Sequence, residues 1–134
     1  MKKYLLVLFV ISLTISACAS KEDAASLVGS WKLTAYGSAD SPTPAVENIE
    51  AHLNFAKDGK LTGNGGCNGL GGNYKVDGDQ ITFSQITSTL KACDDPQMAQ
   101  EDVVHKVLTG IASFKIEGNT LTITKDGTVL ILTH

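Results

Sequence analysis

Arginine is missing from the sequence, so all 11 basic side chains are lysines, and they stand against 14 acidic ones. Arginine is the side chain that makes bidentate contacts with phosphate, and nucleic-acid-binding domains concentrate basic residues on one face. An acidic chain without arginine is therefore expected not to bind nucleic acid. It also offers no basic patch for anionic lipid headgroups.

The chain also lacks the short motifs of common catalytic and metal sites. Its three cysteines and three histidines show no C-x-x-C or H-x-x-x-H spacing, which argues against a metal site. No G-x-x-x-x-G-K-[ST], complete G-x-G-x-x-G or G-x-S-x-G occurs, so phosphate binding and serine catalysis lack support. His105 follows Glu101 by one helical turn, where a surface pair accounts for it. We therefore expect no catalytic residue, no metal, no cofactor and no enzymatic activity.

Long apolar runs are scarce as well, and the clearest one, residues 4–15 (YLLVLFVISLTI), is too short to span a bilayer. A basic start precedes it and small residues follow it, the layout of a secretory signal. Residues Ile15–Cys18 also resemble the bacterial lipobox, whose cysteine is lipidated after cleavage. The resemblance implies that residues 1–17 are a signal peptide and that acyl chains such as palmitate on Cys18 hold the protein on a membrane. The alternative is an ordinary secreted protein with a chance cysteine.

Without residues 1–17, which contain two of the 11 lysines, the chain would carry a formal charge of −5. Residues 18–27 are small and charged, as in a tether, and residues 28–134 are enough for one domain. With no aspartate after Cys18, the start resembles that of lipoproteins sent to the outer membrane of the bacterial envelope. Lys21–Asp23 also resembles a signal for surface export, although a solvated charged tether explains it equally well.

The domain has mostly period-two patterning, which predicts β-strands. Alternating apolar residues indicate a first strand at 31–35 and a second around 53–55, separated by a loop at 37–48 that holds two of the three prolines. An acidic residue followed by glycine then recurs between alternating runs, as in AKDGKLTG, KVDGDQITF, KIEGNTLTI and TKDGTVLIL. Such pairs favour type I′ hairpin turns. We predict a mainly β fold: a small antiparallel, lipocalin-like barrel or half-barrel.

One segment departs from this pattern and predicts a helix over about 96–109. Asp94 is placed as its N-cap, Pro96 at its first position and Gly110 at its C-terminal cap. The apolar face should contain Ala99, Val103, Val104, Val107, Leu108 and Ile111. The expected core is Trp31, Leu33, Leu53, Phe55, Tyr74, Phe83, Val107, Leu108 and Phe114.

The glycine-rich stretch TGNGGCNGLGGNY (62–74) surrounds Cys67. If Cys18 is lipidated in an exported chain, Cys67 and Cys93 remain as a pair, and a disulfide is their expected state. The glycines would then supply positive φ angles and close backbone approach in a sharply bent strand, with Asn68 tolerating the left-handed region. Two separate buried thiols, a metal site, a cysteine nucleophile and a phosphate site are the alternatives.

Several of these elements together resemble the META domain, the family of the heat-shock protein HslJ. The resemblance rests on Gly66-Cys67-Asn68, Gly72-Asn73-Tyr74, Thr89 to Cys93, Met98 to Glu101 and the opening Gly29-Ser30-Trp31-Lys32-Leu33. It covers essentially residues 27–134. Many members carry arginine after the threonine, where this chain has Leu90-Lys91. The residues that match the family motif include Gly66, Asn68, Thr89 and Glu101.

The family resemblance implies a β-rich, lipocalin-like fold in the cell envelope without an established enzymatic activity. Its members are linked in broad terms to heat shock, novobiocin tolerance and, in some parasites, virulence. We therefore expect a lipid-anchored, non-enzymatic envelope protein with a stress-response or protein-interaction role and an unidentified protein partner. The alternative is a barrel that binds a small apolar molecule or antibiotic, and an enzyme ranks last because no cleft of convergent polar groups is evident.

Overall fold

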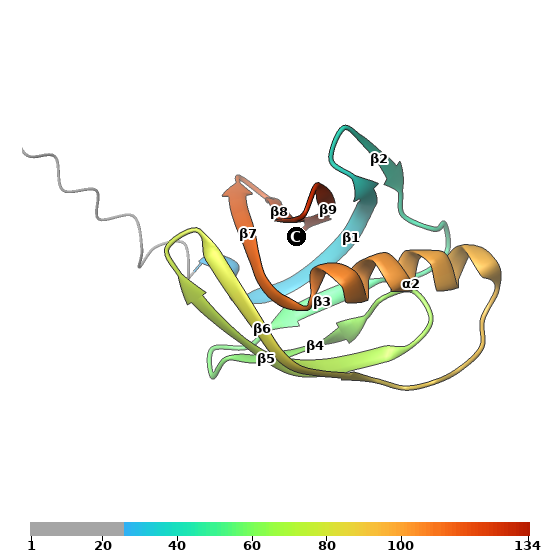
Figure 1. Cartoon of the computed structure of the whole chain (residues 1–134), viewed down its shortest axis with the longest axis horizontal. Helices are drawn as coiled ribbons and strands as arrows, with labels where there is room; N and C mark the ends of the chain where they lie inside the picture. Colours follow the sequence, from blue (N-terminus) through green and yellow to red (C-terminus); the bar gives the residue numbers. More distant parts are fainter. Residues whose placement is uncertain (1–25) are drawn as a thin grey trace, which may run out of the picture.

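The structure, a computed structural model, describes residues 26–134, so the leader, Cys18 and most of the tether lie outside the described residues. Its elements are β1 (Gly29–Ser38), β2 (Ser41–Pro44), β3 (His52–Phe55), β4 (Lys60–Asn64), β5 (Gly69–Asp77), β6 (Gln80–Ser88), α2 (Asp95–Val107), β7 (Gly110–Glu117), β8 (Thr120–Lys125) and β9 (Thr128–Thr133) (Figure 1).

Eight of the strands form a closed antiparallel barrel. β3 to β9 pair in sequence order, and β1 closes the ring by pairing with β3 on one edge and β9 on the other. The short strand β2 pairs with residues 35–38 of β1, beyond residues 29–32 of β1, which pair with β3. The predicted mainly β barrel with one helix is therefore confirmed. Closure matters physically because a closed barrel leaves few unpaired strand edges.

Tight turns connect β3 to β4, β5 to β6, β7 to β8 and β8 to β9, at the four predicted acidic–glycine sites. Glycine provides a positive φ at each of them: 83° at Gly59, 61° at Gly78, 59° at Gly118 and 72° at Gly127. A type I′ turn needs positive φ at two successive residues. Only Asp126–Gly127 has that feature among the four, so the hairpins were predicted correctly and the turn type at the other three was wrong.

A continuous apolar core fills the barrel, and eight of the nine expected members belong to it. The ninth, Tyr74, is only partly buried: its ring lies edge-on to Phe55 and its hydroxyl donates a 2.6 Å hydrogen bond to the Ala56 carbonyl oxygen. Trp31 is almost fully buried, and its indole N–H donates to the main-chain oxygen of Leu27 at 2.8 Å. Polar atoms on large aromatic side chains therefore find main-chain acceptors.

Helix α2 occupies residues Asp95–Val107, with Asp94 as its N-cap residue and proline in its first turn, as predicted. It ends two residues earlier than expected, because Leu108 is the C-cap, while Gly110, with φ of +66°, begins β7. The helix packs against β1, β8 and β9 (Figure 1). The expected apolar face was partly wrong: Ala99 is exposed and Ile111, in β7, is 58% exposed.

The expected loop at 37–48 contains the end of β1 and the whole of β2. Its prolines suggested irregular structure, since proline cannot donate to a strand ladder. In the fold, Pro42 and Pro44 lie on a short exposed strand paired with β1 on one side, where a missing N–H is tolerated. The prediction of a loop was therefore wrong for six residues, namely Gly37 and Ser38 of β1 and the four residues of β2.

Candidate functional site

A disulfide joins Cys67 to Cys93, with their Cα atoms 6.0 Å apart, as predicted. It links the glycine-rich loop after β4 to the segment that leads into α2. Closing a loop with a sequence separation of 26 contributes about 3.5 kcal/mol in the chain-entropy model. Because both sulfurs are engaged, neither a thiolate nucleophile nor a thiolate metal ligand is present at these positions in this structure.

Two glycines beside this disulfide permit backbone to approach where a side chain would clash. At Gly66, with φ of +140°, an added Cβ would lie 2.7 Å from Nε2 of Gln100. At Gly63 it would lie 2.2 Å from the main-chain oxygen of His52 on the neighbouring strand. The expected close approach is confirmed. Asn68 does not use the left-handed conformation that asparagine tolerates, because its φ is not positive. Its side chain is buried, at 2% exposed.

The side chain of Asn68 binds two separate segments. Its amide N–H groups donate to Oε1 of Glu101 at 2.7 Å and to the Lys91 carbonyl oxygen at 3.2 Å. Its carbonyl oxygen accepts from the hydroxyl of Thr89 at 2.8 Å and from the Lys91 N–H at 2.7 Å. Two donors and two acceptor sites are all that an asparagine amide offers. Asn68 therefore fastens the segment from Thr89 to Lys91 against helix α2.

Glu101 is the other centre of this network and is only 4% exposed. Its Oε2 accepts the main-chain N–H of Asn68 at 2.5 Å and that of Cys67 at 3.1 Å, while Oε1 accepts from the Asn68 amide. Burial raises the pKa of the Glu101 carboxyl, but hydrogen bonds from Asn68 and Cys67 and the nearby His105 outweigh burial and lower it. The carboxylate is therefore stabilised as the anion. The prediction of a surface pair was wrong in its location: His105 interacts with Glu101, but Glu101 is buried.

Gln100 continues the network on the adjacent position of the helix and is fully buried. Its Nε2 donates to the Gly65 carbonyl oxygen at 3.0 Å, and its Oε1 accepts from the N–H of Val46 at 2.8 Å. Together, Gln100 and Glu101 connect α2 to the glycine-rich loop and to the segment after β2. Among the described residues, these two polar side chains occupy the buried face of α2 beside Val104 and Val107.

A hollow of about 350 Å³ opens beside this network. One wall comes from the segment that continues β6 and the other from α2; the lining residues are Asn68, Ser88, Thr89, Leu90, Lys91, Ala92, Met98, Glu101, Asp102 and His105. Leu90 is 96% exposed on its rim, whereas large apolar side chains of this domain are otherwise mostly buried. Nε2 of His105 is a buried nitrogen with no hydrogen-bond partner. We regard this hollow as the candidate site.

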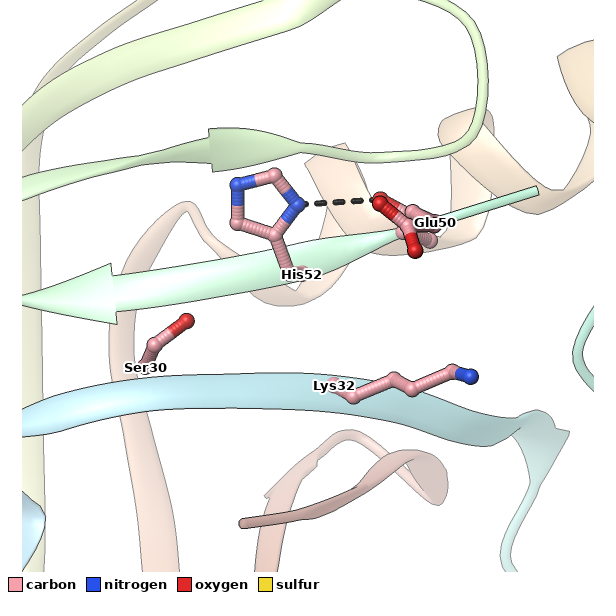
Figure 2. A pocket seen from close by; sticks show the side chains of 5 residues that line it. Ser30, Lys32, Glu50 and His52 are labelled. Atoms are coloured by element: carbon pink, nitrogen blue, oxygen red, sulfur yellow. Dashed lines mark hydrogen bonds between the residues drawn. The ribbon is translucent and has the colours of Figure 1, made fainter.

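A second hollow, of about 330 Å³, lies on the outer face where β1 meets β3 (Figure 2). Figure 2 shows Ser30 and Lys32 on β1 beside Glu50 and His52, with the amine of Lys32 pointing away from the imidazole. Nδ1 of His52 lies 2.9 Å from the main-chain oxygen of Glu50, so that ring nitrogen is already engaged locally. These polar groups diverge and do not form a reaction centre.

Among residues 26–134, no cluster of three or more histidine, cysteine or acidic side chains is placed to hold a metal ion. No helix in that range is long and apolar enough to cross a bilayer.

A comparison with protein-family models matches the META domain over residues 25–134. The chain belongs to the META domain family. The match spans the whole described barrel, including the disulfide and the Asn68–Glu101 network. It therefore confirms the resemblance inferred from the glycine–cysteine–asparagine stretch and from the segments around Thr89 and Glu101.

Solved structures share the fold of this META domain. A protein from Burkholderia xenovorans superposes with a TM-score of 0.67 at 20% sequence identity, covering 99% of this chain and 97% of that one. A lipocalin-like protein from Bacteroides uniformis gives a TM-score of 0.50 at 25% identity, covering 80% of this chain and 96% of that one. A comparison with curated proteins gives no match.

The sequence-predicted residues of this META domain are brought together only in part. Gly66, Cys67, Asn68, Thr89, Cys93 and Glu101 meet around the network, whereas Cys18 lies outside the described residues. Sequence reasoning missed the role of Gln100, and it placed Glu101 on the surface. The available signal was that Gln100 and Glu101 occupy positions on the face of the helix that also carries its apolar residues. Polar residues at such positions are buried with hydrogen-bond partners.

Proposed function

We propose that this META-domain protein is a lipid-anchored component of the bacterial envelope that acts by binding another protein rather than by catalysis. The observation that carries the proposal is Leu90, an apolar side chain that is 96% exposed at the edge of a hollow. An apolar side chain held on an ordered segment is suited to a protein interface, because little conformational entropy is lost on binding.

The segment that carries Leu90 is held on both sides of that residue. The Thr89 hydroxyl and the Lys91 N–H both donate to the Asn68 side chain, and the Cys67–Cys93 disulfide follows two residues later. Leu90 is thus presented by backbone that is fixed before any partner arrives. This arrangement favours recognition, since preorganised contacts lose less free energy on association than mobile ones.

The chemistry of the network supports a non-catalytic role. Asn68 uses all four hydrogen-bonding positions of its amide within the domain, and both oxygens of Glu101 already accept N–H groups. Glu101 also has a lowered pKa, whereas a general acid or base near neutral pH needs a raised one. These groups are committed to holding the fold, so they are poor candidates for reacting with a substrate.

Anchoring and a stress-related role rest on sequence alone. The lipobox-like residues Ile15–Cys18 support lipidation at Cys18 in the outer membrane, with residues 18–27 as the tether. The alternative, binding of a small apolar molecule inside the barrel, is not favoured, because side chains such as Trp31, Phe55 and Leu61 are at most 1% exposed and fill the interior.

A site-specific crosslinking experiment tests the proposal. A photoreactive amino acid replaces Leu90 in the full chain, expressed in its own host, and membranes are irradiated after heat shock. The matched control carries the same group at Ile111, the other exposed large apolar side chain among residues 26–134. We expect one discrete protein adduct from position 90 and none from position 111.

Anchoring is measured in the same cells. Intact mass spectrometry should find acyl chains on Cys18, and Cys18→Ser should release the protein from the membrane and remove the adduct. Reduction should add the mass of two hydrogens, with no bound small molecule before it. A co-purifying apolar molecule, or an absence of adducts at position 90 in anchored protein, would contradict the proposed function.

A further inference from the structure

Strand β6 has an edge that no other strand covers. β6 (Gln80–Ser88) pairs with β5 along most of its length, but β7 pairs only with Gln80–Phe83. Within the described part of the chain, no strand pairs with the second edge of Ser84–Ser88. An uncovered strand edge carries N–H and C=O groups that can accept another strand.

The direction of these main-chain groups follows from the pairing with β5. The Thr89 N–H donates to the Gly69 carbonyl oxygen at 3.0 Å, so Thr89 points its main-chain groups toward β5. In an antiparallel ladder, successive residues point alternately to the two sides. Ser88 therefore directs its N–H and C=O groups to the uncovered edge, and Ile86 follows in the same alternation. A register shift between Gly71 and Asn73 leaves Gln85 and Ile86 together between the paired residues Ser84 and Thr87, and Gln85 has a φ of +54°.

Helix α2 lies across from the end of this edge, since residues of α2 and the segment that begins at Ser88 line the same hollow. Phe83 pairs with Gly110 at the start of β7, and α2 ends three residues before Gly110, at Val107. The hollow of about 350 Å³ is lined from both sides, by Ser88 to Ala92 and by Met98 to His105. Because α2 packs on β1, β8 and β9, space remains between it and β6.

We propose that the uncovered edge of β6 at Ile86 and Ser88, together with the hollow between Ser88–Ala92 and α2 into which it leads, forms a groove that binds an extended peptide segment of a partner protein by strand addition. The proposal rests on the proposed interaction role and names the partner's chemistry. The peptide main chain pairs with Ile86 and Ser88, and its side chains alternate between the groove and the solvent.

The groove favours a peptide with an apolar side chain beside a basic one. Leu90 and Met98 offer apolar contact at the hollow, and the carboxylate of Asp102 lies on its helical wall. The exposed side chains of Asp94 and Asp95 stand at the start of the same helix, so three aspartates face two lysines, Lys91 in the lining and Lys106 one helical turn after Asp102. This excess of negative charge selects lysine or arginine, and it disfavours acidic peptides.

The unpaired Nε2 of His105 gives the helical wall a polar group without a partner. A buried nitrogen without a hydrogen bond is costly, and a peptide N–H or C=O in the groove becomes its partner once the imidazole turns toward the groove. The faces that meet His105 carry Glu101 one turn earlier on the helix and Lys91 and Asp102 in the hollow. Strand pairing and this histidine thus lie on opposite walls of one groove.

The probe is the capped heptapeptide acetyl-Lys-Thr-Val-Lys-Val-Thr-Lys-amide, labelled for fluorescence anisotropy and added to the full chain in detergent micelles. We expect saturable binding, and at least tenfold slower hydrogen exchange of the Ile86 and Ser88 amides in the complex. A matched peptide with glutamate in place of lysine should bind at least tenfold more weakly. So should a peptide N-methylated at its pairing positions, because it lacks the donors.

Protein variants provide the second half of the test. Ser88→Pro removes an N–H that faces the groove and leaves the bonds to β5 in place, and we expect at least a tenfold loss of affinity. If that variant fails to fold, Asp102→Lys gives the same answer: it should weaken binding by at least tenfold. Asp40→Lys, the same charge change in the exposed turn between β1 and β2, should leave binding unchanged.

Equal binding of the acidic and basic peptides, or binding that leaves the Ile86 and Ser88 amides unprotected, would overturn the inference. Protection of these amides that appears with protein concentration alone would assign the groove to a second copy of the chain and overturn it too. Both results leave the crosslinking test at Leu90 intact. Failure of this inference is thus distinguishable from failure of the proposed function.

Discussion

At the scale of single residues, Asn68 and Glu101 form the polar centre of the domain. Asn68 makes four side-chain hydrogen bonds, and Glu101 accepts three N–H groups while almost fully buried. Buried polar groups in such networks are costly to unpair, because each group left without a partner retains its desolvation cost. The residues shared with the family motif thus have a structural explanation.

Substitution of Asn68 tests this explanation. Asn68→Ala removes four hydrogen bonds and leaves the main-chain groups of Lys91 and Oε1 of Glu101 without these partners. We therefore expect the free energy of unfolding to fall by about 2–4 kcal/mol. The matched control is Asn73→Ala, which removes one exposed bond to Gln85 and should cost less than about 1 kcal/mol. Urea unfolding measures both. Equal losses would show that the network is not a stabilising centre.

The lowered pKa of Glu101 makes stability depend on pH in a defined direction. A folded-state pKa below the ordinary value of 4.5 contributes stability that is present above that value and lost as the pH falls through the folded pKa. Glu101→Gln should therefore be less stable than the wild type at pH 7, and the difference should shrink as the pH falls below 4.5. Urea midpoints between pH 7 and 3 check this.

Glu117→Gln serves as the control for that pH series, because Glu117 is exposed and paired only with Lys115 at the surface. Its stability profile should follow that of the wild type. A constant difference between Glu101→Gln and the wild type over the whole range would show that the carboxylate is not preferentially stabilised as an anion.

At the scale of elements, glycine decides how closely strands β3, β4 and β5 meet. Gly63 and Gly69 both lie in the glycine-rich region, but an added Cβ at Gly63 would lie 2.2 Å from the His52 oxygen, whereas at Gly69 the nearest atom is 3.9 Å away. Neither has a positive φ. The two positions therefore separate close packing from backbone conformation.

Alanine at these two glycines should affect the free energy of unfolding differently. Gly63→Ala forces β3 and β4 apart, and we expect a loss of about 1–3 kcal/mol. Gly69→Ala makes only an ordinary van der Waals contact, with the Gly63 oxygen at 3.9 Å. It should change stability by no more than about 1 kcal/mol, in either direction, since it also reduces the freedom of the unfolded chain. Thermal unfolding of both variants is the measurement, and similar melting temperatures would contradict the packing argument.

Helix α2 shows how an element can be predicted while its buried face is not. Asp94, the proline in the first turn and the apolar spacing located the helix to within two residues. Its buried face contains Gln100 and Glu101, which have partners in segments more than 30 residues away in the chain. Local spacing predicts which positions form a helix, but only the distant acceptors and donors make burial of these polar residues favourable.

At the scale of the whole molecule, the barrel is completed by pairing the first strand with the last. Leu33 on β1 faces Leu132 on β9 in this closing register, and both are buried. Since the two ends of the domain meet here, a cavity at this seam affects every strand. The domain should behave as one cooperative unit.

Leu132→Ala tests that cooperativity. We expect a loss of about 2–5 kcal/mol, because the substitution leaves a cavity in the core. Fluorescence of Trp31, the single tryptophan, and far-ultraviolet circular dichroism should agree with each other on the urea midpoint in the wild type. The two probes should also agree in the variant, at a lower urea concentration. An earlier fluorescence transition in the variant would mean that the β1–β9 seam opens separately from the rest.

The sequence by itself determined the hairpins, the helix, most of the core and the disulfide pair, because turn chemistry, periodicity and cysteine count are properties of neighbouring residues or of composition. It did not predict β2, since the pairing of proline-containing residues depends on which edge of β1 is left uncovered. Only the tertiary structure buried Glu101 and Gln100, opened the edge of β6 and placed Leu90 at a hollow. Each of these depends on contacts between segments far apart in sequence, where the free energy of burying a polar group or leaving an edge open is decided by the partner and not by the residue.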